Sequence, residues 1–129
     1  MIKYLINPSI RNEQLNDLFA ISWIHFVRKD FSKILGKSLT YVCAFNEDQL
    51  IGFVNIAWDG DLHAFLLDTT VHPAFRKQGI GTQLVLTGIE EARKRNIEWI
   101  HVDYELKLDP FYKQCGFKET KAGLLNLKD

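Results

Sequence analysis

The residues best suited to binding chemistry lie in the stretch 68–82, between a predicted strand and a predicted helix. Arg76 and Lys77 place two cations beside Gly79 and Gly81, and a helical pattern begins directly after them. The first N–H groups of a helix have no partner within it, and the helix dipole favours negative charge there. Glycine lets a backbone approach an anion closely and tolerates positive φ. The pattern therefore predicts a phosphate-binding turn, although a plain strand-to-helix connection would use glycines in the same way.

This turn matches neither of the two commonest nucleotide-binding motifs. The P-loop pattern G-x-x-x-x-G-K-[ST] is absent, and Gly79-Ile80-Gly81 lacks the third glycine of the dinucleotide fingerprint. The sixteen basic residues of the chain balance sixteen acidic ones, so no global field attracts nucleic acid or an acidic membrane. We therefore expect local anion binding, with neither nucleic acid nor membrane as a partner.

Hydrophobic periodicity and turn residues predict the elements that position this turn. Strands are predicted at 2–6, 40–45, 50–58, 62–71, 99–104 and 117–127, with helices at 13–36 (one or two, broken near 23–28), 80–96 and 111–115. The order strand, turn, helix, strand over 62–104 forms a crossover, which places its two strands parallel. Ligands bind beyond the carboxyl ends of such strands, where 76–82 and 104–109 would meet.

Length and composition predict one soluble globular domain in a reducing cytoplasm. The chain has 129 residues, of which 47% are hydrophobic and 25% charged. Cys43 and Cys115 offer no disulfide framework, and the four histidines do not fall at metal-ligand spacings. We expect no metal. The sequence shows neither a signal-peptide pattern nor an apolar run of about 18 residues, and the cytoplasm is the simplest location.

Two motifs in the second half resemble those of the GNAT superfamily of acyl-CoA N-acyltransferases. The segment 71–81 reads VHPAFRKQGIG and resembles the family pattern V-x-P followed by [RQ]-x-x-G-x-[GA]. The segment 111–117 reads FYKQCGF and resembles the second signature, Y-x-x-x-G-F. The resemblance covers residues 50–120 and implies a single N-acetyltransferase domain over 1–129. It implies an α/β fold whose mixed, mostly antiparallel sheet has about six to seven strands, helices on both faces and a splayed parallel strand pair.

The resemblance further implies acetyl-CoA as cosubstrate. Its pyrophosphate would lie on the amides of 78–82, and its pantetheine would pair with the strand ending at Val71 as a missing strand would. An amide near Thr70 or Val71 would polarise the thioester carbonyl. The cofactor-binding residues implied are Thr70, Val71, Arg76, Lys77, Gln78, Gly79, Ile80, Gly81 and Thr82.

Tyr112 is the general acid that the resemblance implies, giving a proton to the departing CoA thiolate. A phenol with a pKa near 10 and a thiol with a pKa near 8.5 are well matched for this transfer. The alternative role for Tyr112 is that of an aromatic packing residue.

For the general base the sequence offers Asp68 and Glu105, besides Asp103, and each could equally be a solvated carboxylate. Glu105 also departs from the family, where many members carry an asparagine that binds pantetheine.

The implied reaction is direct acetyl transfer from acetyl-CoA to a primary amine in a ternary complex. The alternative is a CoA-binding sensor or interaction module without catalysis, and a third reading is a phosphate-binding domain outside the family. A homodimer is left open. Acidic residues could favour a cationic amine, or could be no more than turn and surface residues; they are Glu47, Asp48, Asp59, Asp61 and Glu105.

Overall fold

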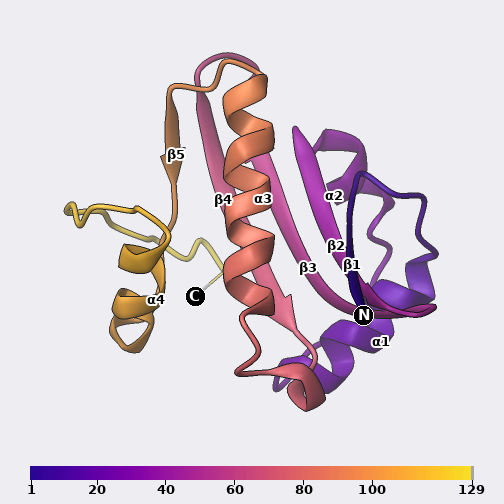
Figure 1. Ribbon diagram of the computed structural model, residues 1–129. Helices are drawn as coiled ribbons and strands as arrows, with labels where there is room; N and C mark the ends of the chain where they lie inside the picture. Colours follow the sequence, from indigo (N-terminus) through magenta and orange to yellow (C-terminus); the bar gives the residue numbers. More distant parts are fainter. Residues whose placement is uncertain (129) are drawn as a thin grey trace.

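The computed structural model describes residues 1–128, which form an α/β fold around one sheet of five strands in the order β1-β2-β3-β4-β5 (Figure 1). In chain order the elements are β1 Ile2–Ile6, α1 Asn12–Ser22, α2 Ser32–Lys37, β2 Thr40–Asn46, β3 Gln49–Trp58, β4 His63–Val71, η1 Pro73–Phe75, α3 Ile80–Lys94, β5 Trp99–His101, η2 Leu106–Leu108 and α4 Asp109–Gln114. Within residues 1–128, no helix is both long enough and apolar enough to span a bilayer.

The sheet is antiparallel except at its last pair, β4 and β5. Their parallel pairing runs from His63–Trp99 to Phe65–His101 and then stops. The rest of β4, from Leu66 to Val71, has no partner in β5. This confirms the predicted crossover, and it leaves one edge of β4 open toward its carboxyl end.

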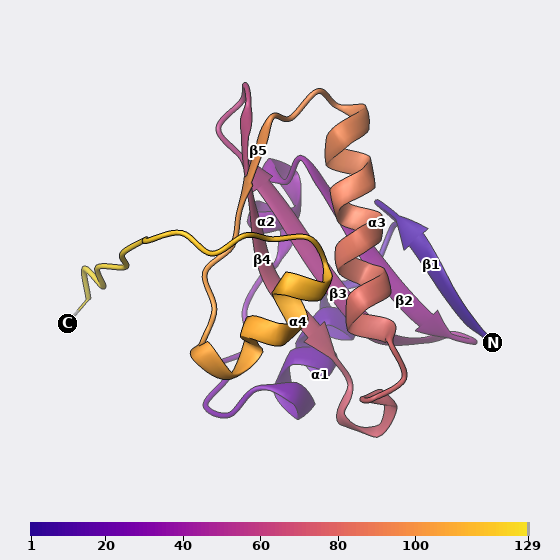
Figure 2. The same ribbon diagram turned by 60° about the vertical axis from the view of Figure 1, so that its left-hand side comes forward.

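Helices cover both faces of the sheet, as predicted. Figure 2 shows α3 and α4 on one side and α1 and α2 on the other. On the second face the Phe19 ring packs against Phe31 and Phe53, with centroids 5.1 and 5.9 Å away. On the first face α3 approaches the sheet closely, since a Cβ on Gly88 would lie 3.2 Å from Ile56 Cδ1. The expected reason for a glycine inside this helix is thereby confirmed.

A β-bulge interrupts β4 near its carboxyl end. Phe53 pairs with Thr70 and Asn55 pairs with Leu67, so that two residues of β4, Asp68 and Thr69, lie opposite one residue of β3. Asp68 has φ 59°, a left-handed conformation that is uncommon outside glycine but several-fold enriched in aspartate. Bulges of this kind turn side chains in new directions next to binding sites.

Two strand predictions differ from the structure. The predicted strand at 99–104 ends at His101, and the predicted strand at 117–127 is wrong, because that segment has no regular structure. The sheet therefore has five strands where six to seven were expected. Residues 118–123 are charged residues, threonine, alanine and glycine, a mixture mostly unsuited to strands. The leucines that follow pack on nothing described, since Leu124, Leu125 and Leu127 are 82–85% exposed.

Candidate active site

The glycine turn ends in a helix start with unpaired amides. Gly79 is the N-cap of α3 in a left-handed conformation, with φ 79°, and Lys77 just before it has φ 64°. The backbone hydrogen bonds of α3 begin with the Gln83 N–H, which donates to the Gly79 carbonyl at 3.1 Å. The preceding amides of the helix are free because a helix has no acceptor for its first N–H groups. This end of α3 is thus able to bind an anion.

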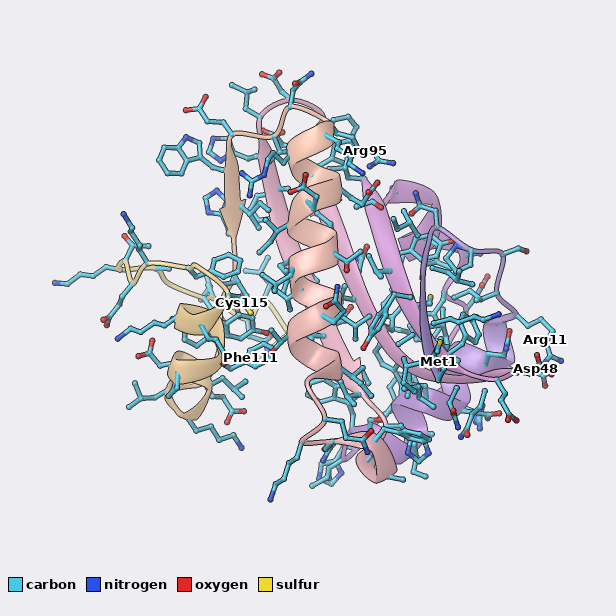
Figure 3. All side chains as sticks on the ribbon, in the orientation of Figure 1. Met1, Arg11, Asp48, Arg95, Phe111 and Cys115 are labelled. Carbon is cyan, nitrogen blue, oxygen red and sulfur yellow. The ribbon has the colours of Figure 1, made fainter. Side chains whose placement is uncertain are left out.

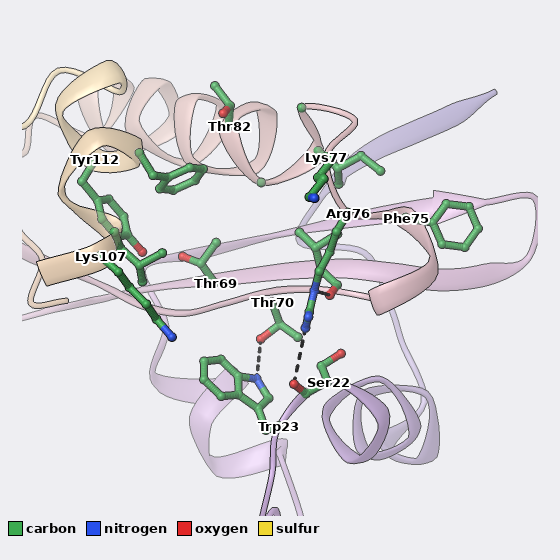
Figure 4. A pocket seen from close by; sticks show the side chains of 16 residues that line it. Ser22, Trp23, Thr69, Thr70, Phe75, Arg76, Lys77, Thr82, Lys107 and Tyr112 are labelled. Carbon is green, nitrogen blue, oxygen red and sulfur yellow. Dashed lines mark hydrogen bonds between the residues drawn. The ribbon is translucent and has the colours of Figure 1, made fainter. Parts of the chain in front are cut away.

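A pocket of about 600 Å³ lies against this helix start (Figure 4). It extends from the first turn of α3 across the end of β4 to the last residues of α1 and to α4. Its lining residues are Ser22, Trp23, Thr69, Thr70, Val71, Phe75, Arg76, Lys77, Gly79, Ile80, Gly81, Thr82, Lys107, Leu108, Phe111 and Tyr112. Two segments that are far apart in the sequence, around Gly79 and around Tyr112, therefore share one cavity.

The bulge in β4 directs two consecutive threonines to different parts of this pocket. Thr70 faces α1, where its Oγ1 accepts a hydrogen bond from the Trp23 indole at 2.9 Å and donates to the Asp68 carbonyl at 2.8 Å. Thr69 faces Tyr112 (Figure 4). The Thr69 hydroxyl is buried beside the Tyr112 hydroxyl and makes no hydrogen bond of standard geometry among the described residues. The two hydroxyl groups are nevertheless close enough for Thr69 to influence the Tyr112 O–H.

The Tyr112 hydroxyl is held in place by aromatic packing. Tyr112 is buried in α4, its ring stacks on Tyr104 at 4.7 Å, and Phe111 and Phe117 meet it edge-on. Burial raises the pKa of Tyr112, and the neighbouring Thr69 hydroxyl opposes that rise by lowering the pKa. The phenol is therefore protonated at neutral pH. A protonated hydroxyl at the wall of a pocket is chemically suited to donate a proton.

Most of the residues predicted from the sequence line this pocket. Tyr112 does, and so do the nine implied cofactor-binding residues except Gln78. Asp68 and Glu105, the predicted bases, do not line it, and none of the five acidic residues considered for a cationic acceptor does. Asp68 is exposed as a residue, but neighbouring atoms crowd its carboxyl group, and this partial desolvation raises the pKa of Asp68 while Lys29 lowers it. Glu105 is exposed and lies 3.4 Å from Lys107.

The pocket also contains residues that the sequence did not single out. Ser22 and Trp23, at the end of α1, and Lys107, in η2, all line it. The Arg76 side chain turns away from α3 toward α1, where its Nε donates to the Val71 carbonyl at 3.3 Å and its Nη2 to the Ser22 carbonyl at 3.4 Å. The one available signal was the break in helical periodicity at Trp23, which marks the point where α1 ends.

Comparison with known proteins identifies the family of this chain. Residues 7–117 match the model of the acetyltransferase (GNAT) family. The chain belongs to this family. Among its relatives is an uncharacterized N-acetyltransferase, ycf52, of Gracilaria tenuistipitata, which is 28% identical over 109 residues. That alignment covers 81% of the chain but only 60% of the relative, so the chain is considerably shorter than this family member.

Solved structures of the GNAT family share the fold. A GNAT family acetyltransferase from Streptococcus pneumoniae superposes with a TM-score of 0.78 over 98% of this chain and 99% of that protein, at 21% identity. The aminoglycoside N-acetyltransferase AAC(6')-Iy, in complex with a bisubstrate analogue, gives a TM-score of 0.80 over 100% of this chain and 99% of that protein, at 18% identity. At these identities the likeness establishes the fold alone, so the site must be argued from its own residues.

Proposed function

We propose that this GNAT domain, over residues 1–129, is an N-acetyltransferase that moves the acetyl group of acetyl-CoA directly to a primary amine. The observation that carries the proposal is the shared pocket. A helix start able to bind an anion and a protonated phenol, Tyr112, line the same cavity of about 600 Å³. An anion site alone would fit many phosphate ligands. Together with a buried acid it fits a phosphate-bearing acyl donor whose leaving group needs a proton.

Three features of the chain fit the parts of acetyl-CoA. The free amides at the start of α3, with Lys77 beside them, would bind the pyrophosphate. The open edge of β4 from Leu66 to Val71 would pair with the amides of pantetheine, in the manner of an added strand. The thioester would then lie beside the bulge at Thr69, within reach of Tyr112. A backbone amide at Thr70 or Val71 would stabilise the oxyanion.

The proposed reaction needs no covalent enzyme intermediate. The amine nitrogen attacks the thioester carbonyl, the carbon–sulfur bond breaks, and Tyr112 protonates the departing thiolate. Holding both reactants in one pocket supplies much of the acceleration. Asp68 is the proposed base, acting through water because it does not line the pocket; its raised pKa brings it closer to neutral pH than an ordinary aspartate.

The base assignment is tested with two variants that remove one carboxylate each. Asp68→Asn should remove the acidic limb of the pH–rate profile, whereas Glu105→Gln should leave that limb unchanged because Glu105 is exposed outside the pocket. If both variants retain the limb, solvent rather than Asp68 takes the proton.

The function itself is tested first by binding and then by turnover. Acetyl-CoA at a hundredfold above its dissociation constant should stabilise the folded protein by about 2.7 kcal/mol, which a thermal shift detects. Release of free CoA thiol is then followed over a panel of amines and peptides. No thermal shift with either acetyl-CoA or CoA would overturn the proposal. Binding without thiol release for any amine would favour the non-catalytic CoA sensor instead.

A further inference from the structure

The pocket has two halves, which lie on opposite sides of the end of β4 (Figure 4). On one side lie Lys77 and Thr82 with the first turn of α3, which the proposed function assigns to CoA. On the other side lie Ser22 and Trp23 at the end of α1. If acetyl-CoA occupies the first half, as proposed, the second half is the part of the pocket that remains for the amine acceptor.

Positive charge dominates this second half. The charged side chains that line the pocket are all cations, namely Arg76, Lys77 and Lys107, and no aspartate or glutamate among the described residues joins them. Figure 4 shows the Arg76 side chain extending away from α3 to Ser22, and the Lys107 side chain extending toward Trp23. Two of the three cations are thus directed at the acceptor half.

Neither of these two cations is neutralised by a strong partner. The hydrogen bonds of Arg76 go to backbone carbonyls, at Val71 and Ser22, which carry no full charge. Lys107 pairs with Glu105 at 3.4 Å, but both side chains are at least 75% exposed, and exposed ion pairs of this kind contribute little. An amine that arrives as an ammonium ion would be repelled here unless it carried a compensating negative group.

A buried hydroxyl in the same half lacks a partner. Ser22 Oγ is buried without a hydrogen-bond partner among the described residues, and Ser22 lines the pocket. Unpaired buried hydroxyls are rare because each one loses its contact with water. The Ser22 hydroxyl has almost no accessible surface, so an acceptor would pair first with the exposed cations Arg76 and Lys107.

We propose that the acceptor is a primary amine that also carries an anionic group, a carboxylate or a phosphate, held by Arg76 and Lys107. This inference rests on the proposed function for the location of the donor. The Trp23 ring forms a wall of the acceptor half, fixed by its indole N–H, which donates to Thr70. In the reaction a nitrogen–carbon bond forms and the carbon–sulfur bond breaks. The ammonium nitrogen loses two protons: the first passes through water to Asp68, the base of the proposed function, and on to solvent, and the second, released as the amide forms, returns to Tyr112, which has given its own proton to the thiolate, so charge and atoms balance.

Matched pairs of amines test this assignment. O-phosphoethanolamine is compared with ethanolamine, and β-alanine with β-alaninamide, so that each pair differs only in the anionic group. Spermidine serves as a polycationic amine. Thermal shift of the protein saturated with CoA measures acceptor binding, and thiol release from acetyl-CoA measures turnover. The anionic member of at least one pair should bind, and react, about tenfold better than its partner, as expected for a charge-assisted contact.

A variant with the charge of Lys107 reversed tests whether the preference for anionic amines arises in the pocket. Lys107→Glu should lower the affinity for the anionic amine about tenfold and leave the affinity for CoA unchanged. Lys121→Glu is the matched control, since it changes the net charge equally from an exposed position outside the pocket. An unchanged preference in Lys107→Glu would overturn the assignment of Lys107.

The outcomes separate this inference from the proposed function. If the anionic amines bind the CoA complex but release no thiol, the anionic acceptor site stands and catalysis fails. If ethanolamine, β-alaninamide or spermidine reacts as well as the anionic amines, catalysis stands and the acceptor class is wrong. If one of them binds as well but no amine releases thiol, both the acceptor class and catalysis fail. If no amine of the panel shifts the melting temperature of the CoA complex, the anionic acceptor is overturned as well.

Discussion

The ring of Phe111, which is labelled on α4 in Figure 3, lies 3.4 Å from the point that a Cβ on Gly81 would occupy. This contact joins the first turn of α3 to α4, and so brings together the two sequence motifs that resemble the GNAT signatures. Val71 lies 3.6 Å from the same point, at the end of β4. Gly81 therefore lies where three elements of the pocket wall meet, and the size of its side chain controls how closely they approach.

Substitution of Gly81 should separate the effect of bulk from the effect of helix propensity. A single methyl group at 3.4 Å from Phe111 makes ordinary van der Waals contact, and alanine favours a helix over glycine by about 1 kcal/mol. Gly81→Ala should therefore leave the melting temperature unchanged or slightly higher, with acetyl-CoA affinity retained. Gly81→Glu places bulk and negative charge at the helix start, and should abolish acetyl-CoA binding in a protein that remains folded.

Circular dichroism and calorimetric titration check both variants. Gly81→Ala is the control for the loss of glycine itself. Retained acetyl-CoA affinity in Gly81→Glu would mean that the pyrophosphate does not bind at the start of α3.

Removal of the Tyr112 hydroxyl should affect turnover more than binding. Tyr112→Phe keeps the ring that stacks on Tyr104 at 4.7 Å, so the packing of α4 should survive. The departing thiolate would lose its proton donor, and general acid catalysis contributes about a hundredfold or more. We expect kcat to fall by about that factor while the dissociation constant of acetyl-CoA changes little. Equal losses in kcat and in acetyl-CoA affinity would indicate a binding role instead.

Much of the fold followed from local patterns in the sequence. The change from alternating to helical periodicity at Ile80, and the strand-helix-strand order around it, predicted the parallel pair of β4 and β5. The strand predicted at 117–127 is absent because residues 118–123 are mostly charged or small and have low strand propensity, although the outer edge of β5 and part of β4 remain unpaired. Leu124 and its neighbours are apolar, but they are largely exposed and pair with no strand among the described residues.

The site was predictable where backbone geometry specifies the residue type. Gly79 adopts φ 79°, which favours glycine, so this position stood out in the sequence. Arg76 and Lys77 stood out for a separate reason, because they place positive charge beside it. The acceptor half was not predictable in this way. Trp23 and Lys107 reach the pocket through tertiary packing, and the bulge that turns Thr69 toward Tyr112 depends on the register between β3 and β4. Lys107 and the bulge carry no local signature, and Trp23 was marked only by the break in helical periodicity.

Asp68 should make the protein less stable as pH rises. A carboxylate paired with a cation has the opposite effect, because its pKa is lowered in the folded state. Partial desolvation raises the pKa of Asp68 above its value of 3.8, so the folded state retains a proton that the unfolded state has lost. Stability should then fall as pH rises from 3.8 through the raised pKa. Asp68→Asn cannot ionise, and asparagine tolerates the left-handed conformation at φ 59°.

We therefore expect Asp68→Asn to gain stability relative to the parent protein as pH increases from 3 to 7. Urea unfolding at several pH values measures the difference between the two proteins. Glu105→Gln, at an exposed carboxylate, is the control and should show no such gain. A difference that stays constant across this range would mean that the Asp68 carboxyl is not desolvated in the folded state.

Trp23 should report occupancy of the acceptor half by its fluorescence. The Trp23 indole donates to Thr70 Oγ1 at 2.9 Å, and the residue is 48% exposed at the pocket wall, so a bound ligand would change the water around the ring. Trp23→Phe should abolish the fluorescence change on acceptor binding and weaken acceptor affinity, while the affinity for acetyl-CoA changes much less. Trp99→Phe removes a tryptophan that is 59% exposed outside the pocket, and should leave the change intact. A signal that survives in Trp23→Phe and disappears in Trp99→Phe would move the acceptor to the opposite end of the β4–β5 pair, where Trp99 pairs with His63.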